Sequence, residues 1–97
     1  MSKIDQAKQI FQLKKLEKEM KKMVITAEQG DGAVRVEVSG EQKIKKIHID
    51  PEYVDLEDIG QLERWLEDAV REATQEAQKI AVEKMAPYMG LLSSLGQ

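Results

Sequence analysis

The sequence has 97 residues, and its 15 basic and 18 acidic side chains give a net charge of −3 at pH 7. It has no cysteine, which excludes disulfides, thiolate metal sites and a cysteine nucleophile. No apolar run approaches the roughly 18 residues of a membrane span, and the N-terminus lacks the apolar segment of a signal peptide. We therefore expect one cytoplasmic domain over residues 1–97.

The charge is unevenly distributed along the chain. Residues 1–25 carry seven lysines against three acidic residues, whereas residues 51–97 carry four basic and ten acidic residues. This asymmetry indicates a basic N-terminal segment that either meets an anion or neutralises the acidic C-terminal half.

Residues 3–23 are predicted to form a helix, because no Gly or Pro interrupts them and Ser2 is suited to be the N-cap. Its apolar residues form two stripes that are out of phase. The first contains Ile4, Ala7 and Phe11, and the second contains Leu13, Leu16, Met20 and Met23. The favoured interpretation is that this apolar surface packs on a partner helix. A membrane-surface helix is disfavoured, since Met and Gln are poor anchors and the acidic half of the chain would be repelled.

Residues 24–29 and 33–39 are predicted to be two strands of a hairpin, since Val34, Val36 and Val38 alternate with polar residues. Gly30-Asp31-Gly32 between them is a strong turn signal. If Asp31-Gly32 is a two-residue turn, Gly32 requires a positive φ. The facing pairs are then Ile25 with Val38, Ala27 with Val36, Gln29 with Val34 and Glu28 with Arg35.

A third strand is expected over residues 43–50, after a turn supplied by Gly40. If the loop after Gly40 has an even number of residues, Ile47 and Ile49 match Val34 and Val36 on the apolar face. Ile44 has the opposite parity, so either it faces solvent or a partner subunit, or a β-bulge lies near Lys45-Lys46. Pro51 then ends the strand. The three strands form an antiparallel meander with one apolar face, which a helix must cover.

A long helix is expected over residues 57–86, followed by a tail at 87–97. Pro87 is expected to end it by disfavouring helical geometry at Ala86. Its apolar face contains Leu62, Leu66, Ala69, Val70, Ala73, Ala77, Ile80 and Ala81. The fold class is therefore α+β: an N-terminal helix, a three-stranded antiparallel meander and a long C-terminal helix. Since so small a chain cannot cover all this apolar surface, we expect a homodimer.

The sequence offers little for catalysis. His48 is the only histidine, and it lies on the solvent side of a predicted strand. The acidic residues of the long helix are spread over its outer faces, unlike a metal site. We therefore expect no enzyme activity, no cofactor or metal, and no small-molecule substrate.

Lysines are the feature that suggests nucleic acid. They are concentrated in the first helix, and Lys43, Lys45 and Lys46 add to them on the third strand. No aromatic residues alternate with them as in single-strand binders, and no helix-turn-helix or zinc-finger spacing occurs. What remains is phosphate contact without base readout, or simply a solvated lysine face.

The order of these segments resembles the YbaB/EbfC family of nucleoid-associated proteins. The resemblance rests on residues 32–40 (GAVRVEVSG), 47–51 (IHIDP), 62–63, 69–73 (AVREA) and 83–85. It implies a helix, three strands and a helix in each subunit of a tweezer-shaped homodimer. It also implies binding to double-stranded DNA in the nucleoid with little sequence preference.

If the chain has this fold, the two helices run antiparallel to each other and form an arm, because the chain passes from the first helix into the sheet and from the sheet into the second helix. The expected DNA-contacting residues are Lys3, Lys8, Lys14, Lys15, Lys18, Lys21, Lys22, Lys79 and Lys84. Lys3, Lys8, Lys79 and Lys84 are expected at the tip of the arm. The alternative is a dimeric protein-binding adaptor with no direct DNA contact, which the acidic second helix favours.

Overall fold

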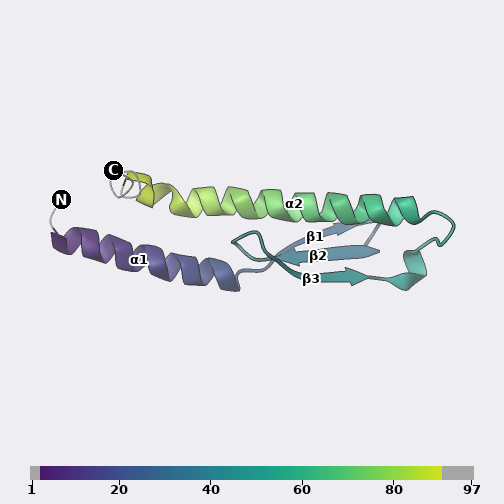
Figure 1. The fold of residues 1–97 in the computed structure, drawn as a ribbon, viewed down its shortest axis with the longest axis horizontal. Coiled ribbons are helices and arrows are strands. Elements are labelled where there is room, and N and C mark those ends of the chain that lie inside the picture. The colour runs from purple at the N-terminus through teal and green to yellow at the C-terminus, as the bar shows by residue number, and fades with distance from the viewer. Residues whose placement is uncertain (1–2, 91–97) are drawn as a thin grey trace.

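The computed structural model describes residues 3–90. Residues 1–2, with the predicted N-cap Ser2, and residues 91–97 lie outside the described part. Helix α1 (Lys3–Lys22) precedes strands β1 (Ile25–Gln29), β2 (Val34–Val38) and β3 (Ile44–Ile49). A 3₁₀ turn, η1 (Pro51–Tyr53), leads into the long helix α2 (Ile59–Met85). Figure 1 shows α2 passing over the sheet and continuing beside α1, which projects from the same end of the sheet. The chain runs in opposite directions in the two helices. The predicted α+β fold class is confirmed.

The β1–β2 hairpin has the register that the sequence predicts. Ile25 pairs with Val38, and Glu28 pairs with Arg35. Asp31 (φ 54°) and Gly32 (φ 93°) both have positive φ, which is the signature of a type I′ turn. The N–H of Ala33 closes this turn on the carbonyl of Gly30 at 3.1 Å.

A β-bulge in β3 explains why Ile44 is out of alternation with Ile47 and Ile49. Val34 pairs with Ile49 and Val36 with Ile47, but the register then shifts so that Val38 pairs with Ile44. The extra residue is Lys45, because Lys46 still pairs with Glu37. Of the alternatives left open by the sequence, the β-bulge is therefore correct. It places the side chain of Ile44 on the same face of the sheet as that of Val38.

Gly40 lies in the turn between β2 and β3, as predicted, and the N–H of Gln42 closes this turn on the carbonyl of Ser39 at 3.0 Å. The residue with positive φ between β2 and β3 is Gln42 (φ 66°). The N–H of Gly40 donates a 2.8 Å hydrogen bond to the carbonyl of Met20, near the end of α1. A Cβ at Gly40 would lie 2.9 Å from that oxygen, so glycine is needed for this close approach.

The core lies between α2 and the strands β1 and β2. Val34, Val36 and Val38 are fully buried, and the column Ala69, Ala73 and Ala77 covers them from α2. These methyl side chains let the helix backbone approach the sheet closely. Trp65, Leu66, Val70 and Ile80 pack around this centre and are only partly buried.

The ends of α2 show one correction. The side chain of Asp58 accepts a 3.2 Å hydrogen bond from the N–H of Gln61 and caps the first turn. At the other end, Ala86 keeps helical angles (φ −49°, ψ −43°), contrary to the expectation for a residue before proline. Pro87 lacks an N–H, so the regular helix ends at Met85, but the 3₁₀ turn η2 (Ala86–Tyr88) carries the chain onward.

The hairpin turn allows a first prediction, in which Gly30→Ala destabilises the fold more than Gly32→Ala. Both glycines have positive φ, so each alanine carries a backbone cost of about 1 kcal/mol. A Cβ at Gly30 would also come 2.6 Å from Cε2 of Trp65, whereas Gly32 has open space. We expect a loss of roughly 2–4 kcal/mol for Gly30→Ala, measured by urea unfolding at fixed protein concentration. Equal losses would mean that Trp65 moves aside freely.

Candidate nucleic-acid interface

The basic surface of the molecule is an arm that projects from the sheet. All seven lysines of α1 are exposed, and the helix lies beyond the strands at one end of a molecule 64 Å long (Figure 1). The sequence folds this way because only Met23 and Val24 separate α1 from β1, and the Gly40–Met20 hydrogen bond fixes the exit of the helix. The arm therefore carries its lysines into solvent, away from the core.

The two apolar stripes of α1 have different environments. Leu13 and Met20, seven residues apart, are its two buried residues. Phe11, by contrast, is 72% exposed and Ile4 is 69% exposed. Since 3.6 residues make one turn, Phe11 and Leu13 point about 200° apart. Within residues 3–90 the second stripe is thus buried at Leu13 and Met20, whereas the first stripe is exposed in the single subunit and its packing on a partner helix stays a prediction.

Lys79 and Lys84 are not at the tip of the arm. Met85 lines a hollow of about 390 Å³ together with Met20, Lys21 and Glu17 of α1. Lys84 is therefore level with the C-terminal half of α1, and Lys79 is closer still to the sheet. The predicted placement beside Lys3 and Lys8 is wrong, because most of α2 is used to cross the sheet before it reaches the arm.

The lysines of α1 are not neutralised by α2. Among residues 3–90, the ion pairs within 4.0 Å are Lys43–Glu41 and Arg71–Asp68, and neither involves α1. The opposite end of the molecule is acidic, because the connection from β3 to α2 (Figure 1) contains five carboxylates and no basic residue. They are Asp50, Glu52, Asp55, Glu57 and Asp58. Among the described residues, the lysines of α1 thus make no direct ion pair with the acidic half of the chain, which favours contact with an external anion over neutralisation.

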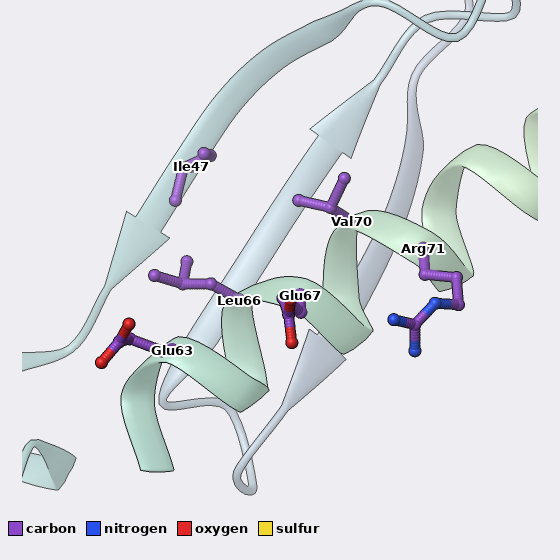
Figure 2. A pocket seen from close by; sticks show the side chains of 6 residues that line it. All are labelled: Ile47, Glu63, Leu66, Glu67, Val70 and Arg71. Carbon is purple, nitrogen blue, oxygen red and sulfur yellow. The ribbon is translucent and has the colours of Figure 1, made fainter. Parts of the chain in front are cut away.

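A second surface feature is an apolar groove beside the uncovered strand β3. Ile47 of β3 and Leu66 and Val70 of α2 line it, as Figure 2 shows. The groove is open and has a volume of about 490 Å³, with Glu63, Glu67 and Arg71 at its margin. All residues of β3 are exposed, and Ile47 itself is 46% accessible to solvent. Because α2 lies over β1 and β2, the apolar face of the sheet is only partly covered.

The single histidine of the chain and the acidic side chains are the remaining groups that catalysis or metal binding could use. His48 is exposed on β3, opposite Arg35 in the sheet. In the part of the chain that is described, no group of three or more His, Asp and Glu side chains is arranged to hold a metal ion. Within residues 3–90, no helix combines the length and the apolarity needed to cross a membrane.

Comparison with known proteins decides the family. The profile of the YbaB/EbfC DNA-binding family matches residues 1–92. The chain belongs to the YbaB/EbfC DNA-binding family. A nucleoid-associated protein of Corynebacterium jeikeium is 36% identical over 94 residues, covering 96% of this chain and 90% of that protein. One from Chloroflexus aurantiacus is 33% identical over 84 residues, covering 87% and 84%.

A solved crystal structure has the same fold. The crystal structure of an uncharacterised Helicobacter pylori protein superposes with a TM-score of 0.73 and covers 86% of each chain. At 22% sequence identity this likeness concerns the fold alone. The order of helix, meander and helix in this chain is thus one that a crystallised protein also adopts.

The two sides of α1 lead to a second prediction. Leu13→Ala should destabilise the packing of α1, because Leu13 is only 8% exposed, whereas Phe11→Ala should not. We expect faster amide exchange in residues 14–22 for Leu13→Ala, equivalent to roughly 1–3 kcal/mol of local stability. Phe11→Ala is the matched control, with unchanged exchange. Equal acceleration by both substitutions would show that Phe11 is also packed.

Proposed function

We propose that this protein is a nucleoid-associated protein that binds duplex DNA as a homodimer, mainly through lysine–phosphate contacts. The observation that carries the proposal is the arm α1, with seven exposed lysines and no ion pair to the acidic residues of α2. Its charge is free to meet an external polyanion. Membership of the YbaB/EbfC DNA-binding family supports DNA as that polyanion and the nucleoid, in the cytoplasm, as its location.

Low sequence specificity follows from the chemistry of the arm. Lysine presents a flexible point charge suited to phosphate, whereas base readout in the major groove uses planar bidentate side chains such as Arg or Asn. Lysine is the most frequent exposed residue of α1, which has no arginine or asparagine. Gln6 and Gln12 are its exposed amide side chains. Non-specific binding of this kind has a Kd on the order of 10⁻⁴–10⁻⁶ M at physiological salt.

The homodimer is supported by the uncovered apolar surface beside β3. Ile47, Leu66 and Val70 form an open apolar groove next to an unpaired strand edge. An exposed edge with apolar neighbours is a surface on which another chain can pair or pack. A second copy placed here would cover both features and leave α1 of each subunit projecting, as the tweezer shape requires.

The competing function is a dimeric adaptor that binds a protein without contacting DNA. The acidic connection between β3 and α2, which includes Asp55 and Glu57, favours it because such a surface repels phosphate. The two functions differ in their dependence on salt. DNA binding through phosphate weakens steeply as salt rises, and an adaptor has no DNA affinity to lose.

A third prediction tests the DNA surface. Lys14, Lys15 and Lys18 are changed together to Gln, and binding to a random duplex is titrated across a salt series. Each lost phosphate contact should reduce the slope of log K against log salt by about one unit. We expect a decrease of up to about three units and weaker binding to every sequence.

The control is Arg64→Gln, which removes an exposed positive charge near the acidic end of the molecule. This substitution should leave the slope unchanged. If the triple variant stays folded and keeps the wild-type affinity and slope, α1 is not the DNA surface. If the wild type shows no salt-sensitive binding at low salt, the adaptor function replaces the DNA-binding one.

A fourth prediction concerns the dimer. The wild type should sediment with about twice the chain mass at micromolar concentration. Ile47→Lys should halve that mass, because it places a charge in the apolar groove, and its exposure in the single subunit spares the fold. His48→Lys, on the opposite face of the same strand, is the matched control and should remain dimeric. A folded wild-type monomer would refute the homodimer.

A further inference from the structure

Phe11 is the single aromatic residue of α1; it is exposed, and its surroundings are basic. It lines a hollow of about 210 Å³ whose other walls are Lys14, Lys15 and Lys18. Toward the tip of the arm it lines a second hollow of about 390 Å³, together with Ile4, Ala7, Lys8 and Gln12. An apolar ring thus lies between two depressions on the face that is turned away from Met20 and α2.

We propose that Phe11 is an apolar contact residue of the DNA surface, packing into a groove of the duplex while the neighbouring lysines bind the flanking phosphates. The inference rests on the proposed function and adds to it a residue that bears no charge. Proteins that deform DNA often insert an apolar wedge beside phosphate-binding cations. A phenylalanine on sugars and base edges has no hydrogen-bonding code, so this contact adds affinity with little sequence preference.

The charge around Phe11 argues against a second copy of α1 as its occupant. Lys14, Lys15 and Lys18 stand on the same face, and α1 as a whole has seven lysines against three acidic residues. Two such faces brought together would repel each other. The occupant should therefore carry negative charge close to an apolar or π surface, as a DNA groove does between its phosphates.

The shape of the stripe argues against a lipid surface. The stripe is one residue wide and ends at Phe11, because Lys14 and Lys18 take its place one and two turns later. Helices that lie on membranes bury a broad apolar face along their length. A single protruding ring suits a narrow groove better than a bilayer.

The test compares Phe11→Ala with the wild type on a random duplex across a salt series, using the full chain. We expect affinity to fall on the order of 10-fold, as the loss of one partly buried aromatic contact gives. The slope of log K against log salt should stay unchanged, because no charge is lost. Phe11→Trp should retain the wild-type affinity, since it keeps an aromatic surface.

Leu56→Ala is the matched control, because Leu56 is also highly exposed but belongs to the acidic connection. Its DNA affinity should equal that of the wild type. A Phe11→Ala protein with wild-type affinity overturns the inference while leaving the lysine contacts intact. Wild type without salt-sensitive binding overturns both the inference and the proposed function.

Two further measurements separate the other occupants. Sedimentation should give the same mass for wild type and Phe11→Ala; a reduced mass would place Phe11 in a contact between copies and overturn the inference. Flotation with vesicles containing anionic phospholipid should recover neither protein. If the vesicles recover the wild type but not Phe11→Ala, and the two proteins bind DNA with equal affinity, Phe11 belongs to a membrane surface and the inference is overturned.

Discussion

The structure depends on the close packing of one helix on two of three strands. The methyl groups of Ala69, Ala73 and Ala77 let α2 approach the valines of β2, and this contact forms the core. A helix is about 10 Å wide with its side chains, so it cannot also cover a third strand at such close range. The uncovered apolar row of β3 and the groove beside it are the direct result. A wider covering helix face would have protected β3 and removed the groove that supports the proposed homodimer.

The same helix also determines where charge is displayed. Because α2 crosses the whole sheet before reaching the arm, its acidic outer face lies over the strands and its last turns meet only the C-terminal half of α1. The N-terminal half of α1, including Lys3 and Lys8, thus carries its charge beyond the acidic part of α2. Basic and acidic side chains are thus separated along the long axis of the molecule, which explains how a chain of net charge −3 can still present a basic surface.

Much of the fold was predictable from local patterns, whereas the faces of α1 were not. The hairpin register follows from alternation and a two-residue turn, since a slip by one residue would expose the valines. The bulge at Lys45 was foreseen as an alternative because Ile44 breaks the parity. Phe11 and Leu13 looked alike in the sequence, and only the position of α2 distinguishes the buried one. The contacts of Gly30 with Trp65 and of Gly40 with Met20 join segments far apart in the chain, which periodicity cannot reveal. The predicted site lysines are recognisable as a group, but how far Lys79 and Lys84 lie from the lysines of α1 depends on where α2 ends.

The short connection between α1 and β1 couples the direction of α1 to the orientation of the sheet. Only Met23 and Val24 separate the elements, and the hydrogen bond from Gly40 to Met20 ties the end of the helix to the β2–β3 turn. A helix of 20 residues extends about 30 Å, so a rotation of about 10° at the sheet displaces its tip by roughly 5 Å. In a pair of subunits, the gap between the two tips would therefore be set by the angle between the sheets. A small adjustment at the strand edge would widen or narrow that gap by about the distance between neighbouring phosphates.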